Sequence, residues 1–282
     1  MDKSILKIIS NALKEDIGKG DITTKATIEK SKRAVAKFLI KADGVIAGLE
    51  IAKAVFQSVD PKIKFEIKIK DGSQVKYGDV VAIVKGKAQS LLTAERTALN
   101  FLQRMSGIAT SANLYSKKVK HTKAKVIDTR KTVPGLRTLD KMAVEFGGCK
   151  NHRIGLYDMF LIKDNHIEVA GSITKAVEAC VKYQKKHHAK FKIEVETKNI
   201  KEVEEALTTK ADIIMLDNFA VDEMKKAVEL INSHCLVEAS GGVNLETVRS
   251  IAETGVDYIS VGALTHSVKA LDISLEMEIL KN

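Results

Sequence analysis

Apolar residues in the second half of the chain occur in short continuous runs that are separated by amphipathic stretches. The runs, between residues 126 and 264, are "VIDTR", "MFLIKDNH", "IEVETK", "DIIMLDN", "LVEASGG" and "YISVGAL". Stretches such as "NIKEVEEALTTKA" carry apolar residues at helical spacing. Strands that are buried on both faces and alternate with helices indicate right-handed βαβ units. A repeat of about 20 residues favours a (β/α) barrel or barrel-like sheet over an open doubly wound sheet.

The first part of the chain, to about residue 105, mixes helices and strands without a repeat. Apolar residues at helical spacing predict a helix that begins near Ser4 and ends at Gly18. The segment "RAVAKFLIKADGVIAG" predicts two strands with a turn at Asp43-Gly44, and a helix is expected over residues 49–58. The strict alternation in "KIKFEIKIKDGSQVKYGDVVAIVKG" predicts further antiparallel strands with glycine turns. The pattern indicates a small α+β unit.

A long helix is predicted by "SLLTAERTALNFLQRMSGIATSANLYSKKVK", residues 90–120, which has a continuous apolar stripe. Gly107 lies inside this pattern. A glycine at such a position indicates either a break in the helix or a close contact with another segment.

The length of 282 residues suits one large α/β domain, or one such domain with a smaller companion. We expect neither a signal peptide nor a membrane helix, because position 2 is acidic and the sequence has no long apolar run. Cys149, Cys180 and Cys235 are odd in number and lack metal-type spacing. They predict reduced thiols in a cytoplasmic protein.

The formal net charge of +10 is compatible with binding of nucleic acid or of anionic small molecules. Much of the excess is lysine scattered along the chain, as in "VKYQKKHHAKFK", with almost no aromatic residues among it. Scattered lysine is typical of a solvated surface, so the net charge alone does not select a function.

Polar residues and glycines follow each apolar run of the repeat. Because the carboxyl ends of parallel barrel strands converge on one mouth, these residues are expected to form a single site. Taken singly, each has a simpler explanation, and Asp217-Asn218 could merely cap the next helix. The strand-end residues are Arg130, Lys131, Lys163, Asp164, Glu196, Asp217, Ser240, Gly241, Gly242 and Gly262.

Basic and acidic residues at these strand ends predict two kinds of contact. Arg130, Lys131 and Lys163, with Arg153 of "NHRIGLYD", would form an anion trap, in which arginine can hold a carboxylate bidentately. Carboxylates at positions 196 and 217 would suit ribose hydroxyls, a hydrated Mg²⁺ or a developing positive charge.

Glycine-containing segments end the last two runs. "ASGGV" and "SVGAL" lie where barrel proteins bind a phosphate with backbone N–H groups and a helix N-terminus. The sequence therefore predicts a pocket that holds a phosphorylated sugar at one end and a multiply anionic partner at the other.

With these residues in view, nearly the whole chain resembles the quinolinate phosphoribosyltransferase family. The resemblance rests on "LKEDIGKGDITT", "AERTALNFLQRMSGIAT", "DTRKTVPGLR", "FGGCKNHRIGLYDMFLIKDNH", "IEVE", "IMLDN", "EASGGV" and "SVGALTH". It implies an α/β fold with an N-terminal α/β sandwich domain, residues 1–105, and an incomplete (β/α) barrel, residues 106–265. A helical C-terminal tail, residues 266–282, would join the first domain.

The resemblance also implies an enzyme of de novo NAD biosynthesis. Its reaction transfers phosphoribose from phosphoribosyl pyrophosphate to the ring nitrogen of quinolinate. Carbon dioxide is lost, and nicotinate mononucleotide and pyrophosphate are formed with Mg²⁺. The expected assembly is a homodimer or a hexamer, without nucleic acid or membrane.

The family's functional residues carry over to individual positions of this chain. On its own, His152 could equally be an ordinary loop histidine. Lys131 would face quinolinate or the phosphates, and Lys131, Lys163, Glu196 and Asp217 would be the catalytic residues. Quinolinate contacts fall on Arg130, His152, Arg153, Lys163 and the partner subunit's Arg96; ribose and metal contacts, the latter direct or through water, on Glu196 and Asp217; and 5′-phosphate contacts on Ser240, Gly241, Gly242, Gly262 and Ala263.

Two alternatives remain at this point. A homologous protein associated with molybdenum transport keeps the same fold and acts on another acceptor, but the set Arg96, Arg130, Arg153 and Lys163 favours quinolinate. A basic protein that binds RNA or DNA would need clustered lysines and aromatic residues that stack on bases, and the sequence displays neither.

Overall fold

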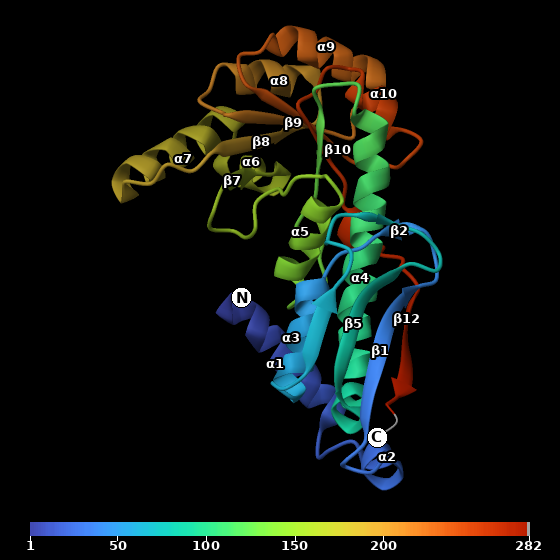
Figure 1. Cartoon of the computed structure of the whole chain (residues 1–282). Coiled ribbons are helices and arrows are strands. Elements are labelled where there is room, and N and C mark those ends of the chain that lie inside the picture. The colour runs from blue at the N-terminus through green and yellow to red at the C-terminus, as the bar shows by residue number, and fades with distance from the viewer. Residues whose placement is uncertain (281–282) are drawn as a thin grey trace. The chain divides into compact units, whose positions relative to one another are not determined.

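The computed structural model describes residues 1–280 and divides the chain into two compact units. Residues 1–113, 132–148 and 267–282 form unit 1, and residues 114–131 and 149–266 form unit 2. The expected boundary near residue 105 differs from this division in residues 106–113 and 132–148, which belong to unit 1. Figure 1 shows both units with their elements labelled.

Unit 1 is built on a four-stranded antiparallel sheet (Figure 1). The sheet follows the predicted period-two pattern, because alternate residues of its first strand, from Ala34 to Ile40, are buried. The predicted helices are confirmed, and the first begins after the N-cap Asp2 and ends at Gly18. The strands lie in the order β12 (Ile273–Ile279), β1 (Arg33–Ile40), β5 (Val80–Lys87) and β3 (Lys64–Ile67), with helices α1 (Lys3–Ile17), α2 (Ile22–Thr27), α3 (Leu49–Val59), α4 (Ala88–Val119) and α5 (Arg137–Phe146).

Aromatic side chains from three elements form the centre of this unit. The rings of Phe38 on β1, Phe56 on α3 and Phe65 on β3 lie 5.7–5.9 Å apart. Phe38 and Phe56 are fully buried. Aromatic pairs at these distances add to the hydrophobic free energy that holds helix and sheet together.

The two strands expected around the turn at Asp43-Gly44 are present, but they do not pair with each other. β2 (Gly44–Val45) pairs with β4 (Gln74–Val75) in a separate two-stranded sheet. β1 instead pairs with β5 and β12 along its whole length. The long alternating partner strands offer many more cross-strand contacts than the short segment after the turn.

The C-terminal tail joins unit 1, but it is a strand rather than the helix implied by the family resemblance. β12 pairs antiparallel with β1, from Ile273 opposite Ile40 to Ile279 opposite Ala34. The tail sequence "ISLEMEI" alternates apolar and polar residues, which is the period of a strand. Residues 281–282 of the predicted tail lie outside the described part of the chain.

The long helix α4 is continuous through Gly107, so this glycine marks a close contact and not a break. A Cβ atom at Gly107 would lie 2.2 Å from the backbone oxygen of Lys269. The absence of a side chain therefore lets the segment that leads into β12 pass directly over the helix.

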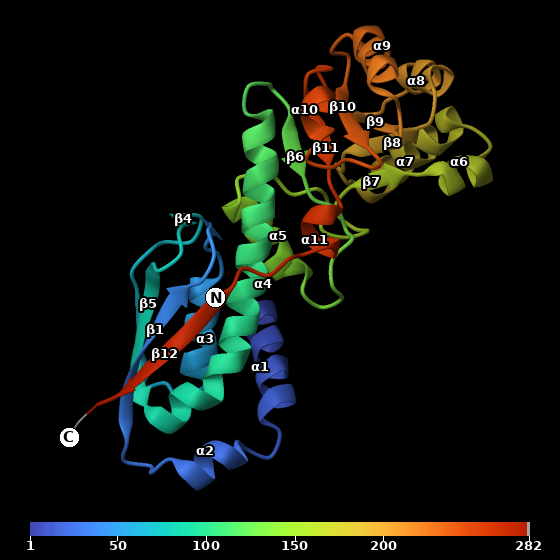
Figure 2. The same cartoon turned by 90° about the vertical axis from the view of Figure 1, so that its right-hand side faces the viewer.

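Unit 2 contains a parallel six-stranded sheet, and each of its strands matches one of the predicted apolar runs (Figure 2). Its outer strands are β6 and β7, so the sheet is an incomplete barrel. Lys150 extends the sheet beyond β6 through a parallel bridge to Ile127. The strand order is β6 (Lys125–Ile127), β11 (Tyr258–Ser260), β10 (Leu236–Ser240), β9 (Ile213–Asp217), β8 (Ile193–Thr197) and β7 (Phe160–Ile162).

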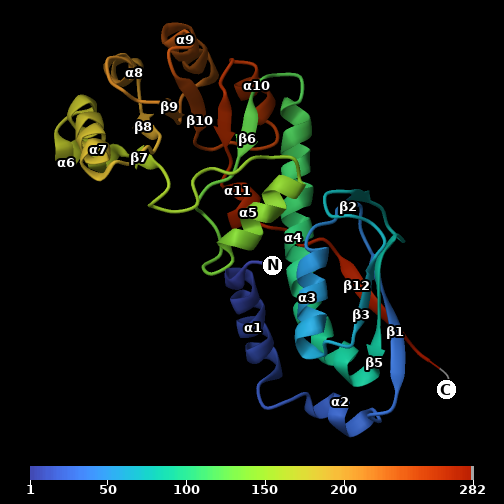
Figure 3. The ribbon, with the colours of Figure 1, turned by 60° about the vertical axis from the view of Figure 1, so that its left-hand side comes forward.

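Amphipathic helices alternate with these strands and pack against them (Figure 3). All five residues of β8 are buried, as expected of a strand that is covered on both faces. The helices are α6 (Asp164–Ala170), α7 (Ile173–His187), α8 (Ile200–Leu207), α9 (Val221–Ile231), α10 (Val248–Ala252) and α11 (Ala263–His266).

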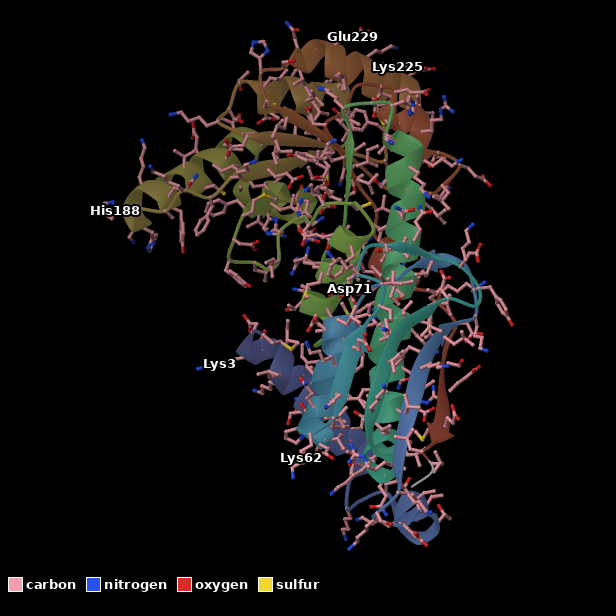
Figure 4. All side chains as sticks on the ribbon, viewed as in Figure 1. Lys3, Lys62, Asp71, His188, Lys225 and Glu229 are labelled. Atoms are coloured by element: carbon pink, nitrogen blue, oxygen red, sulfur yellow. The ribbon has the colours of Figure 1, made fainter. Side chains whose placement is uncertain are left out.

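Charged side chains lie mainly on the surface of each unit, as Figure 4 illustrates with Lys3, Lys62, Lys225 and Glu229. Asp71 is more enclosed and accepts hydrogen bonds from the backbone N–H of Leu49, where α3 begins. The three cysteines are free thiols, as predicted. Within residues 1–280, none of the helices combines the length and the apolar character needed to cross a membrane.

Replacing Gly107 with alanine is expected to destabilise unit 1. Alanine in a helix interior is normally favoured over glycine by about 1 kcal/mol. Here the new methyl group would meet the Lys269 carbonyl, and overpacking of this kind costs about 1–3 kcal/mol. Thermal unfolding should show a lower midpoint for Gly107→Ala, whereas Lys117→Ala, an exposed change on the same helix, should change it little. An unchanged or higher midpoint for Gly107→Ala would refute the close contact.

Candidate active site

A cavity of about 800 Å³ lies in unit 2 at the carboxyl ends of the parallel strands. The residues predicted for the site line it with two exceptions, Arg96 and Asp164, and the exposed Asp164 carboxylate pairs with Lys198 instead. The other strand-end residues line one cavity. The predicted residues that line the cavity are Arg130, Lys131, His152, Arg153, Lys163, Glu196, Asp217, Ser240, Gly241, Gly242, Gly262 and Ala263.

Basic side chains reach the cavity from the ends of β6 and β7 and from the loop between them. Arg130 and Lys131 follow β6, and Lys163 directly follows β7. Arg153 is partly buried, and its guanidinium donates a hydrogen bond to the backbone oxygen of Met159 at 3.1 Å.

Arg130, Lys131, Arg153 and Lys163 form the basic wall of the cavity, and their positive charges affect one another. Burial, followed by the charge of Arg130, lowers the pKa of Arg153 from its ordinary value. Two arginines in such mutual repulsion are a favourable site for an anion, because a bound carboxylate would neutralise both.

Lys163 connects the basic wall to the acidic residues. Its Nζ donates to Glu196 Oε2 at 2.7 Å, and the Glu196 side chain is largely buried. The backbone N–H of Lys163 donates to His166 Nδ1 at the start of α6, so His166 orders the loop that carries the lysine. An ammonium group has three donors, so Lys163 can contact Glu196 and a ligand anion together.

Asp217 lies at the end of β9, opposite Ser240 in the register of β9 and β10. Its Oδ2 accepts a hydrogen bond from the Asn218 side chain at 2.9 Å. Asn218 has a positive φ of 58° and donates its backbone N–H to Ser240. The strained residue therefore fixes the strand end that carries the Asp217 carboxylate.

Glycines shape the part of the cavity at the ends of β10 and β11. Gly241 has a φ of 95°, and a Cβ there would lie 2.1 Å from Asn218 Oδ1. Gly262 leaves room for the stem of Lys131, whose Cδ would be 3.1 Å from a Cβ at position 262. Thr265 Oγ1 donates to the backbone oxygen of Lys131 at 2.9 Å and holds that residue beside the glycine.

His152 occupies a charged environment at the cavity wall. Its Nε2 lies 2.9 Å from Glu194 Oε2 and 3.4 Å from Glu238 Oε2, and both glutamates are buried. Burial alone would lower the pKa of His152, but the hydrogen bonds and charges of the two glutamates raise it to about 10. His152 is therefore protonated at neutral pH and adds a positive charge to the basic wall.

Burial raises the pKa of Glu194 to about 7, with the charge of Glu238 acting in the same direction. The sequence analysis did not select either glutamate. The available signal was an acidic residue in an otherwise apolar strand: Glu194 alternates with Glu196, and Glu238 with Ser240, so each shares a face with a predicted site residue. Further cavity residues outside the prediction are Thr129, Leu161, Met215, Asn218, Glu238, Val243, Ser260 and His266.

Models of the two quinolinate phosphoribosyl transferase domains match nearly the whole chain. The N-terminal domain model matches residues 21–106, and the C-terminal domain model matches residues 108–276. The chain belongs to the quinolinate phosphoribosyltransferase family.

Members of the quinolinate phosphoribosyltransferase family are similar to this chain in sequence and in structure. The "Quinolinate phosphoribosyltransferase [decarboxylating] 1b" of Nicotiana tabacum is 48% identical over 287 residues, covering 96% of this chain and 81% of its own. The nicotinate-nucleotide pyrophosphorylase structure from Francisella tularensis superposes with a TM-score of 0.93 at 39% identity, over 98% of this chain and 96% of its own. The corresponding Ehrlichia chaffeensis structure gives 0.90 at 41% identity, covering 99% of both chains.

Arg96, like Asp164, does not line the cavity. It lies exposed on α4, beside Glu95. The family resemblance assigns its role to the active site of a partner subunit, so that role stays a prediction.

Substitution of Gly241 by alanine should destabilise unit 2 more than substitution of Gly242. Both glycines have a positive φ, so any residue with a side chain would be strained at either position. A methyl group at Gly241 would also meet Asn218, whereas at Gly242 it would meet no atom within 4 Å. Thermal unfolding of Gly241→Ala and Gly242→Ala should therefore give the lower midpoint for Gly241→Ala. Equal midpoints would show that Asn218 is not held against Gly241.

Proposed function

We propose that this protein transfers phosphoribose from phosphoribosyl pyrophosphate to quinolinate and removes a carboxyl group. The products are nicotinate mononucleotide, pyrophosphate and carbon dioxide. The observation that carries the proposal is a single cavity in which a basic wall, the carboxylates of Glu196 and Asp217 and a glycine-rich segment meet. Membership of the family and the similarity to decarboxylating quinolinate phosphoribosyltransferases support this assignment.

Quinolinate would bind along the basic wall. Its two adjacent carboxylates match the guanidinium groups of Arg130 and Arg153, which can each form paired hydrogen bonds. His152 and Lys163 supply further positive charge. Holding the dianion in a fixed orientation places its ring nitrogen for attack on the sugar, and such positioning supplies much of the rate.

Phosphoribose would lie across the cavity from this wall. Ser240, Gly241 and Gly242 after β10, together with Gly262 and Ala263 after β11, would bind the 5′-phosphate through backbone N–H groups. Lys131 lies beside Gly262 and can reach either the phosphates or quinolinate.

Glu196 and Asp217 would stabilise the ribose as the bond to pyrophosphate breaks. The anomeric carbon then develops positive charge, which fixed carboxylates at the ends of β8 and β9 would favour. The same carboxylates can accept hydrogen bonds from ribose hydroxyls. No protein nucleophile is needed, because the ring nitrogen of quinolinate is the attacking group.

Decarboxylation follows from the electronic state of the alkylated ring. Once the ring nitrogen is bonded to ribose, its positive charge stabilises the electron pair that stays on the adjacent ring carbon when carbon dioxide leaves, and a proton from water then takes the place of the lost carboxyl group. The basic wall keeps the remaining carboxylate in place during this step. Little further assistance from side chains is needed.

Mg²⁺ is part of the proposal as the metal bound with pyrophosphate. The donor set fits, because Mg²⁺ prefers oxygen ligands and is commonly held by one or two carboxylates together with phosphates and water. Glu196 and Asp217 would hold it directly or through water. When bound, Mg²⁺ neutralises charge on the leaving pyrophosphate.

The assembly is proposed to be a homodimer or a hexamer in which Arg96 of one subunit completes the quinolinate site of the next. Its exposed position on α4 leaves it available for such a contact.

The activity itself is tested with quinolinate, phosphoribosyl pyrophosphate and Mg²⁺. Nicotinate mononucleotide and carbon dioxide should form in equal amounts, and chelation of the metal should stop the reaction until Mg²⁺ is restored. Failure to form nicotinate mononucleotide under these conditions would reject the proposed function.

Arg130→Ala should weaken quinolinate binding on the order of 100-fold, because a paired hydrogen bond to a carboxylate is lost from a site already rich in positive charge. Calorimetric titration with quinolinate measures the change. Arg249→Ala, which removes an exposed arginine paired with Glu253, serves as the matched control and should bind normally. Unchanged affinity of the Arg130 variant would contradict the assigned anion site.

A mixture of two inactive variants tests the role of Arg96. Arg96→Ala and Arg130→Ala should each be nearly inactive alone. If Arg96 serves the neighbouring subunit, hybrid dimers contain one intact site, and a randomly mixed sample should regain about a quarter of the wild-type activity. A mixture that stays as inactive as its components after subunit exchange would show that Arg96 does not act across subunits.

A further inference from the structure

Two buried glutamates lie at the proposed substrate cavity, and Glu238 is part of its lining. Glu194 of β8 and Glu238 of β10 are 0% and 1% exposed, and β9 lies between their strands. Inward side chains of alternate barrel strands meet in the same layer, which explains how residues from β8 and β10 approach each other. The proposed function assigns no role to either of them.

Both glutamates face the ring of His152. Glu194 Oε2 lies 2.9 Å and Glu238 Oε2 lies 3.4 Å from His152 Nε2. The backbone N–H of His152 donates to Asp128 Oδ1 at 2.8 Å, at the end of β6. Carboxylates from β8 and β10 therefore hold the imidazole ring, Asp128 holds the backbone of the same residue, and the ring also contributes to the cavity wall.

A positive group stabilises the buried carboxylates of this cluster. Among the described residues, Glu194 Oε1 and Glu238 Oε1 have no hydrogen-bond donor, and the contact of Glu238 Oε2 is the ion pair with His152 at 3.4 Å. Buried carboxylates without compensation cost several kcal/mol. The charged groups that face the His152 ring are Glu194 and Glu238, Asp128 contacts the backbone N–H of His152, and Arg153 is the next residue in the chain, so acidic neighbours predominate around the ring.

A buried acidic pair of this kind is not explained by stability alone, because a protein with apolar residues in its place is often as stable or more stable. The pair does, however, hold a cationic histidine at the wall where the proposed dianionic substrate binds. We propose that Glu194 and Glu238 are positioning residues that keep the His152 ring charged and correctly oriented toward a carboxylate of quinolinate. This inference rests on the proposed function.

The test is the double variant Glu194→Gln/Glu238→Gln, which keeps the side-chain shapes and removes both carboxyl groups. The KM for quinolinate should rise about 10- to 100-fold, as expected when a hydrogen bond to a charged group is lost. The KM for phosphoribosyl pyrophosphate and kcat should stay close to wild type, because His152 is assigned to quinolinate. Glu229→Gln, an exposed change on α9, is the control.

The charge of His152 is measured directly by nitrogen NMR of histidine-labelled protein, with the signal assigned from a His152→Gln sample. The wild-type ring should stay doubly protonated from pH 6 to 9, in line with its raised pKa. In the double variant, burial should dominate and the ring should become neutral in this range. Its KM for quinolinate should then rise with increasing pH and recover in acid, which a purely structural defect would not produce.

Three results would overturn the inference. A neutral His152 in the wild-type protein at pH 7.5 would do so even if the double variant does not fold. An unchanged KM for quinolinate would exclude a positioning role. So would a fall in kcat that is accompanied by an equal rise in the KM values of both substrates. A tightly bound metal ion that the double variant loses would assign the cluster to a cation instead. Absence of nicotinate mononucleotide from the wild-type reaction would reject the proposed function separately, because the NMR measurement does not depend on turnover.

Discussion

Convergence of parallel strands is the constraint on which the site depends. The six strands of unit 2 run in the same direction, so their carboxyl ends lie along one edge of the sheet. This geometry gathers Arg130, Lys163, Glu196 and Asp217 from four separate segments into one cavity. The mutual repulsion of the basic groups is a cost to the free protein, and a bound dianion would relieve it. The placement of basic residues at the strand ends therefore favours binding of an anionic ligand.

The cavity contains both basic and acidic residues, and each kind is proposed to contact a different substrate. Lys163 lies at the boundary, paired with Glu196 on one side and close to the basic wall on the other. A ligand carboxylate and a developing ribosyl cation would each find a complementary charge without any change in the backbone. Preorganised charge of this kind stabilises a transition state because no reorganisation is required when the reaction occurs.

Much of this arrangement could be predicted from the sequence because it depends on local patterns. Continuous apolar runs identified all six strands of unit 2, and the residue after each run identified the cavity. Glu194 and Glu238 share a strand face with predicted site residues, but their contact with His152 joins strands that are not adjacent, and no local pattern predicts that contact. The pairing of β12 with β1 was also missed, because the family resemblance outweighed a clear period-two alternation in the tail. The role of Arg96 depends on a second subunit, and one chain does not determine it.

The central claim is that the basic wall of unit 2 binds quinolinate. A crystal structure of the wild-type protein with quinolinate tests it most directly. The account predicts the two carboxylates against Arg130, Arg153 and His152, with the ring nitrogen directed toward Glu196 and Asp217. Quinolinate bound outside this cavity, or with its carboxylates directed away from the arginines, would contradict the account.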